Sequence, residues 1–189
     1  DSVRYLNTFL DRYVKPSTMY TEAGPVIETP LSAAASLQEM LLQSWSTDPF
    51  GTDIRVFPAI PAAWKDVTFH NLRAEGAFLV SASRRDGKTQ FVRIQSLAGA
   101  PCRVRTDLVS PIARGSRSYT LKTETDTNGN PFLTIDLRKG ETVLLTPGSS
   151  GTSASALEIA PVAPQPERIN YYGLKTKTAT APQGTAASE

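Results

Sequence analysis

Cysteine and histidine are almost absent from this sequence: Cys102 is the one cysteine and His70 the one histidine among 189 residues. A single thiol cannot form an internal disulfide, and a thiolate zinc site needs several cysteines. A single imidazole likewise excludes a multi-histidine metal site. The sequence also contains neither a G-x-x-x-x-G-K-[ST] loop nor a G-x-G-x-x-G loop for nucleotides. We therefore expect neither a metal ion nor an organic cofactor.

An excess of charge of one sign and long apolar runs are also missing. The 20 Lys and Arg residues nearly balance the 18 Asp and Glu residues, and the net charge is +2. Without a basic cluster, this balance argues against a nucleic-acid partner. No apolar run is long enough to span a membrane, so no membrane partner is expected. The apolar share of 40% and charged share of 20% are typical of a globular protein.

The first 44 residues carry a helical pattern. Apolar residues recur at helical spacing near the start of the chain, at Val3, Leu6, Phe9, Leu10 and Tyr13. A loop is expected over residues 17–28, which contain Gly24 and Pro25. A second helix is expected to follow, with Thr29 as its N-cap and Pro30 at its first position, where the missing N–H costs nothing.

The second helix has apolar side chains around most of its circumference, including Ala34, Leu37, Met40 and Leu41. Such a helix is usually buried against neighbouring helices. Two helices cannot cover each other completely. We therefore interpret this zone as the end of a larger helical domain.

A β-rich zone follows, in which short apolar runs alternate with turn signals. Asp86-Gly87 and Asn128-Gly129 each lie between two such runs and predict tight hairpins. No helical pattern interrupts the zone, which favours an antiparallel sandwich over a parallel sheet. The expected strands are residues 54–57, 67–72, 78–84, 89–96, 102–106, 119–125, 132–137 and 142–145.

The remaining residues are rich in Pro, Ser, Ala, Gly and Thr and predict a flexible tail. The expected fold class is therefore mixed, with two α-helices, an antiparallel β-sandwich and a tail. The expected domain boundaries are residues 1–48 for the helices, 49–66 for a connector, 67–147 for the sandwich and 148–189 for the tail.

Two carboxylates, Glu22 and Glu28, flank the Gly24-Pro25 loop before the second helix and are candidates for chemistry. Glu28 lies just before the expected helix, where the helix dipole favours its ionised form. An ionised carboxylate in such a loop can act as a general base that activates water. The alternative is that Glu28 is an N-terminal helix charge or an ion-pair partner. His70 and Cys102 are interpreted as structural residues of strands.

Four aromatic residues surround the connector: Trp45, Phe50, Phe57 and Trp64. They could form a sugar-stacking surface. The alternative is that they pack the helical zone on the sheet.

A series of short motifs follows in the chain: residues 39–44 (EMLLQS), 54–59 (IRVFPA), Pro61, 64–66 (WKD), 72–74 (LRA) and 76–78 (GAF). Their succession resembles the C-terminal part of glycoside hydrolase family 95, the inverting α-L-fucosidases and related α-galactosidases. In that family an α/α barrel carries the chemistry, and a helix near its end leads through a connector into a C-terminal β-domain.

The resemblance also implies roles for individual residues. The family usually has an I-D-G-N-F-G segment before the helix, and its aspartate is implicated in activating the attacking water. Residues 27–32 (IETPLS) lie at those positions, so Glu28 corresponds to the aspartate, whereas Gly, Asn and Phe are not kept. Glu28 is thus the candidate general base, and Glu22 is a second candidate for contact with sugar or water.

The implied protein is the C-terminal segment of an inverting glycoside hydrolase that acts on O-glycosyl bonds. Its implied partners are a glycan substrate and the upstream barrel part of the same polypeptide, which would supply the general acid. The segment alone is expected to be inactive. The family's bacterial members mostly act on glycans outside the cytoplasm, so the resemblance implies a secreted or periplasmic location. The alternative is a non-catalytic carbohydrate-binding or structural sandwich module.

Overall fold

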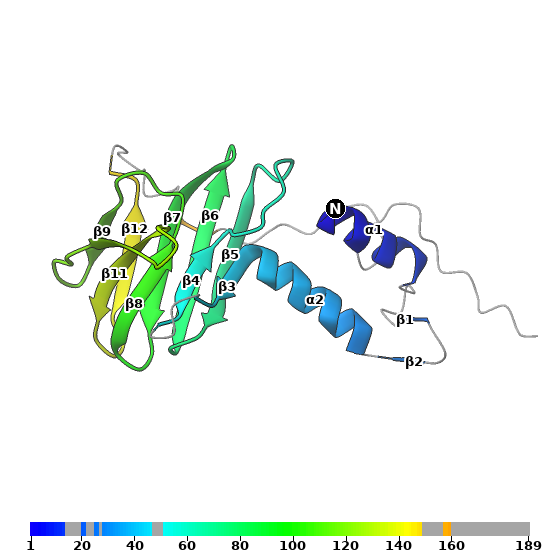
Figure 1. The fold of residues 1–189 in the computed structure, drawn as a ribbon, viewed down its shortest axis with the longest axis horizontal. Helices are drawn as coiled ribbons and strands as arrows, with labels where there is room; N and C mark the ends of the chain where they lie inside the picture. The colour runs from blue at the N-terminus through cyan, green and yellow to red at the C-terminus, as the bar shows by residue number, and fades with distance from the viewer. Residues whose placement is uncertain (14–19, 22–24, 27, 47–50, 149–156, 160–189) are drawn as a thin grey trace, which may run out of the picture. The chain divides into compact units, whose positions relative to one another are not determined.

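The computed structural model describes residues 1–13, 20–21, 25–26, 28–46, 51–148 and 157–159 of the chain (Figure 1). The chain divides into two units, one containing residues 1–36 and the other residues 37–161. Most of the expected tail, 148–189, lies outside the described residues, so its predicted flexibility remains a prediction.

Helix α1 (Ser2–Arg12) begins the first unit, as the helical spacing of its apolar residues predicts. The Tyr5 N–H donates to the Asp1 carbonyl at 3.0 Å, and the Tyr13 N–H donates to the Phe9 carbonyl at 3.0 Å. No residue of α1 is buried. Within the expected loop, β1 (Tyr20–Thr21) and β2 (Pro25–Val26) form a short antiparallel ribbon.

Helix α2 (Glu28–Leu41) confirms the second helix but corrects both of its expected ends. It begins at Glu28, so Thr29 lies inside the helix and is not its N-cap. It ends at Leu41 because the next residues, Leu42–Ser44, pair as strand β3 with β4 (Asp53–Val56). The Phe57 N–H donates to the Leu41 carbonyl at 2.8 Å and fixes the chain at this point.

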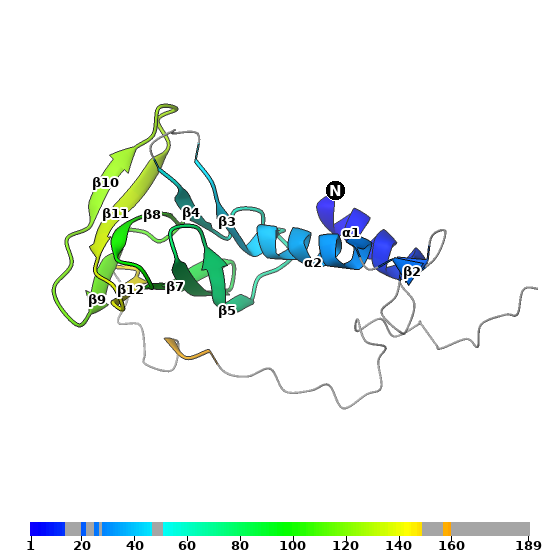
Figure 2. The ribbon, with the colours of Figure 1, turned by 90° about the horizontal axis from the view of Figure 1, so that it is seen from below.

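The second unit contains two five-stranded sheets, which form two layers in Figure 2. Sheet I has the order β10-β11-β8-β4-β3, and sheet II has the order β5-β6-β7-β12-β9. Neighbouring strands are antiparallel except β4 and β8, which pair in parallel. The bounds not yet given are β5 (Val67–Ala74), β6 (Phe78–Arg85), β7 (Lys88–Ser96), β8 (Ala100–Arg105), β9 (Ile112–Gly115), β10 (Lys122–Thr125), β11 (Pro131–Leu137) and β12 (Thr142–Thr146).

Each of the eight expected strands overlaps an observed strand, and the expected sandwich is confirmed. Four strands were not predicted: β3 and β9 in the two five-stranded sheets, and β1 and β2 in the first unit. The expected strand at residues 119–125 begins later, at Lys122. Since β3 and β4 pair within sheet I, the two-layer body includes residues that precede position 67.

Both hairpin turns lie where their dipeptides predict them. Asp86 and Gly87 have φ values of 49° and 74°, the left-handed pair that a two-residue hairpin requires. Gly129 has a φ of 79° in the turn between β10 and β11. These positions favour residues without a steric penalty at positive φ.

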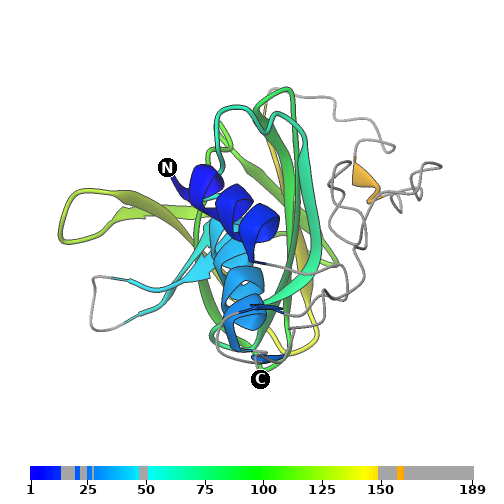
Figure 3. The ribbon, with the colours of Figure 1, turned by 90° about the vertical axis from the view of Figure 1, so that its right-hand side faces the viewer.

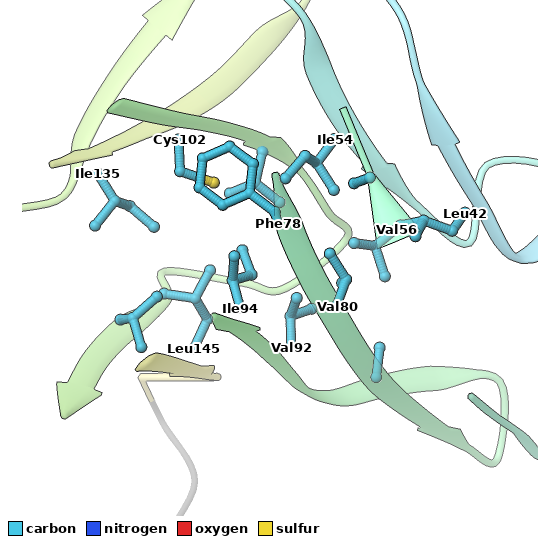
Figure 4. Close-up of a cluster of buried hydrophobic side chains, with 14 of the residues drawn as sticks. Leu42, Ile54, Val56, Phe78, Val80, Val92, Ile94, Cys102, Ile135 and Leu145 are labelled. Atoms are coloured by element: carbon cyan, nitrogen blue, oxygen red, sulfur yellow. The ribbon is translucent and has the colours of Figure 1, made fainter. Parts of the chain in front are cut away.

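The core lies between the two sheets and is built by alternate residues of their strands (Figure 4). Ile54, Cys102 and Ile135 come from sheet I, and Val80 and Ile94 come from sheet II. All five are at most 1% exposed. Burial of this apolar surface is the main source of stability for the sandwich.

Candidate functional site

Glu28 is the first residue of α2, and its side chain is exposed. An acidic residue in the first turn of a helix interacts favourably with the helix dipole. The Ser32 hydroxyl donates to the Glu28 carbonyl at 2.9 Å, which fixes the backbone of this turn. The Glu28 carboxylate therefore lies at a helix N-terminus. This position is compatible with a general base and with a charge that only stabilises the helix.

Glu22 and Phe50 lie outside the described residues. The role assigned to Glu22 stays a prediction, as does that of Glu28.

The other three aromatic residues differ in their exposure. Phe57 is buried and meets the Phe69 ring edge-on, with ring centroids 5.3 Å apart. Trp64 is half-buried. Trp45 is 48% exposed; its ring carries the Arg55 guanidinium 3.7 Å from its centroid, and its Nε1 donates to Gln43 Oε1 at 2.8 Å. The prediction of one sugar-stacking surface is therefore wrong for Phe57, whose ring is buried.

Cys102 and His70 lie where structural residues are expected. Cys102 is fully buried, and burial raises the pKa of its thiol to about 12. Such a thiol is protonated at neutral pH and is a poor nucleophile. His70 is exposed on β5.

A buried ion network on sheet I was not predicted. The Asp53 carboxylate is fully buried and pairs with Arg103 Nε at 2.8 Å and with Arg105 Nε at 2.6 Å. Arg105 Nη2 also pairs with Asp126 Oδ2 at 2.9 Å. The ring of Phe132 lies beneath both guanidiniums, 4.1 Å from Arg103 and 5.4 Å from Arg105.

Arg105 thereby connects two hairpins of sheet I. Asp53 begins β4, and Asp126 lies in the turn between β10 and β11. Figure 3 shows the β10–β11 hairpin and strands β3 and β4 extending to the same side of the two-layer body. The Asn130 N–H donates to Asp126 Oδ1 at 2.8 Å, and this bond is the largest cause that lowers the pKa of Asp126. The ionised form that pairs with Arg105 is therefore favoured.

A second ion pair fixes the segment before β10. Arg117 Nε and Nη2 donate to the two carboxylate oxygens of Glu141 at 2.8 and 3.0 Å. The hydrogen bond from Arg117, followed by the Arg138 N–H, lowers the pKa of Glu141 to about 2. The same pairing raises the pKa of Arg117.

These ion pairs are structural, because each carboxylate is already bound by cations and N–H groups. In the described part of the chain, no three His, Cys, Asp or Glu side chains lie together in a way that could hold a metal ion. No helix among the described residues is long and apolar enough to cross a membrane. Glu28 and Glu22 therefore stay the predicted site residues, as the sequence suggests.

The comparison with known proteins agrees with the motifs. The sequence matches the family model of the glycoside hydrolase family 95 C-terminal domain over residues 51–145, which is half of the chain. No curated protein sequence matches the chain. The matched residues contain β4 to β11 and nearly all of β12, that is, most of the two-layer body. The chain therefore belongs to glycoside hydrolase family 95.

Proposed function

We propose that the chain is the C-terminal part of a larger, inverting glycoside hydrolase of the α-L-fucosidase type, with Glu28 as its general base. The observation that carries the proposal is the family match over the sandwich, together with a carboxylate at the N-terminus of the helix that leads into it. The proposed location is outside the cytoplasm, secreted or periplasmic. Accumulation of the whole enzyme in the cytoplasmic fraction of its source cell would contradict that location.

The surface of the two helices supports a larger helical domain around them. Tyr5 on α1 is 62% exposed, and Leu31 on α2 is 59% exposed. A helix usually buries such residues against neighbours. In the proposed enzyme, α1 and α2 are the last helices of an α/α barrel whose other helices cover these side chains.

The proposed reaction breaks the glycosidic C–O bond in one displacement. Glu28 accepts a proton from a water molecule while the water oxygen bonds to the anomeric carbon, on the face opposite the leaving group. A carboxylic acid from the upstream barrel gives its proton to the departing glycosidic oxygen. Two carboxyl groups roughly 6.5–9.5 Å apart leave room for that water. Since the acid and the sugar pocket lie upstream, the chain alone does not hydrolyse glycosides.

The test uses the whole enzyme, after an intact-mass measurement has shown a polypeptide much longer than these 189 residues. Hydrolysis of an aryl α-L-fucopyranoside is followed by ¹H NMR, which reports the anomer formed first. We expect the inverted anomer, and we expect Glu28→Gln to lower kcat by about 10²–10⁴-fold. Glu39→Gln, an exposed change on the same helix, is the matched control and keeps normal turnover.

Three results would contradict the proposal. A source protein of only this length would remove the barrel, and a first product of retained configuration would remove the inverting mechanism. Normal turnover in Glu28→Gln would remove Glu28 from the reaction.

A further inference from the structure

A polar pocket lies on the outer face of sheet I, in the second unit. It has a volume of about 210 Å³ and is lined by Arg117, Ser118, Thr120, Lys122, Thr134 and Asp136. Successive residues of a strand point to opposite faces, and Ile135 and Leu137 lie in the core. Thr134 and Asp136 of β11 therefore point outward, and Lys122 of β10 is the register partner of Thr134.

Arg117, which forms one wall of this pocket, is fixed by contacts outside the pocket. Arg117 is fixed by its two bonds to Glu141, and its Nη2 also donates to the Asp136 carbonyl at 2.8 Å. The Tyr119 ring lies under the guanidinium, 4.6 Å from centroid to Cζ. Gly115 makes room for that ring, since a Cβ there would lie 2.7 Å from Tyr119 Cε2. Such preorganisation lowers the entropic cost of binding a ligand.

The pocket also contains two opposite charges that do not neutralise each other. Among the described residues, neither the Lys122 ammonium nor the Asp136 carboxylate forms an ion pair or a side-chain hydrogen bond, although Asp136 attracts the Arg117 guanidinium electrostatically. The hydroxyl groups of Ser118 and Thr120 lie on the same lining. The pocket therefore offers a strong donor, a strong acceptor and groups that can do either.

This set of groups selects for ligand charge. Asp136 repels an anion that Lys122 attracts, and Lys122 repels a cation that Asp136 attracts, so an ion of either sign meets one favourable and one unfavourable charge. A neutral polyol suits both charged groups, because a hydroxyl can donate to a carboxylate and accept from an ammonium. The volume is below the range of drug-sized pockets, about 300–1,000 Å³, and suits a single sugar ring.

We propose that this pocket is a non-catalytic subsite that binds one sugar unit of a neutral glycan. It is built entirely from the sandwich unit and uses neither Glu28 nor any residue of the helices. Its existence therefore does not depend on the proposed mechanism. A loss of binding here and a loss of hydrolysis in Glu28→Gln are separate results.

The experiment is an NMR titration of the ¹⁵N-labelled 189-residue chain. The probes are methyl α-L-fucopyranoside and methyl β-D-galactopyranoside, with glycine betaine as a zwitterionic comparison. We expect either glycoside to shift the backbone amides of residues 117–122 and 134–136, with a Kd on the order of 1 mM. Betaine is expected to leave these amides unchanged.

Two conservative variants test the named groups. Lys122→Met and Asp136→Asn are each expected to weaken binding about tenfold, because each removes a charged hydrogen-bond partner. Both positions are exposed, so the spectra elsewhere should match the wild-type spectrum. Lys88→Met and Asp86→Asn, the same exchanges at the exposed β6–β7 turn, are the matched controls and should leave the Kd unchanged.

Three outcomes would overturn the inference. The first is that saturating glycoside shifts no backbone amides, or shifts amides on another surface. The second is that Lys122→Met and Asp136→Asn both bind the glycoside as the wild type does. The third is that betaine displaces the glycoside. Localised shifts that both variants weaken would support it.

Discussion

The helices and the sandwich of this chain differ in how completely they bury their apolar side chains. On α2, Leu31 is 59% and Leu37 is 37% exposed, whereas Val80, Ile94 and Val143 of sheet II have no exposed surface. The sandwich buries its own apolar residues between two sheets. The helical part leaves residues of the same kind in water. The sandwich thus buries its own apolar residues, whereas the helices leave theirs to be covered by the barrel that we propose.

The largest expected effect is a loss of stability of the sandwich. Ile94→Ala removes three methyl or methylene groups from a fully buried site on β7. We expect the free energy of unfolding to fall by an amount in the upper half of the ~2–5 kcal/mol seen for such truncations. Urea unfolding followed by tryptophan fluorescence measures it. A loss below about 1 kcal/mol would mean that the core is loosely packed.

The next effect concerns the ion network of sheet I. Arg105→Met keeps the apolar stem but removes the ion pairs with Asp126 and with the buried Asp53, which keeps its pair with Arg103. We expect a loss of about 3 kcal/mol, near the low end for a broken buried ion pair. Arg114→Met, at an exposed position on β9, is the control in the same urea assay. Equal stabilities of the two variants would mean that Arg105 does not clamp the hairpins.

A smaller effect depends on pH. The pKa of Glu141 is about 2 when folded, below its ordinary value of 4.5. Its stabilising contribution is therefore complete above about pH 4.5 and is lost as the pH falls toward 2. We expect the urea midpoint of Glu141→Gln to be lower than wild type at pH 7 but nearly equal at pH 2. A constant difference at both pH values would contradict this linkage, and Glu158→Gln should show no difference at either.

The smallest expected effect lies in the helical part. Leu31→Ala removes an exposed side chain and introduces a better helix former, so the stability of the 189-residue chain should change by less than about 0.5 kcal/mol. In the whole enzyme the same change is expected to lower the thermal midpoint clearly, because the proposed barrel buries this position. No difference between chain and enzyme would argue against the barrel.

Local signals predicted much of the sandwich. Asp86-Gly87 fixed a hairpin because only a few residues accept two consecutive positive φ angles. The end of α2 was missed because the apolar run through Leu42 continues the helical pattern. Pairing of Leu42–Ser44 with β4 overrides that local preference. The strand Ile112–Gly115 is short and follows a proline, so its pattern carries little signal.

Less of the candidate site than of the sandwich could be predicted from the sequence. Glu28 was selected through a family motif, and the structure adds its place as the first residue of α2. Alternate arginines at positions 103 and 105 could have been noticed within one strand. Their partners Asp53 and Asp126 are far away in the sequence, and only the fold brings them together.

The parallel pairing of β4 with β8 has a consequence for how the protein folds. Ile54 meets Val104 only after all of β5, β6 and β7 have been made. Contacts between residues so far apart in sequence incur a large loop-closure entropy and form slowly. During synthesis, the edge of β4 that pairs with β8 therefore stays unpaired, while the β5–β6–β7 meander can already assemble from local turns. Sheet II is expected to be the scaffold on which sheet I is completed.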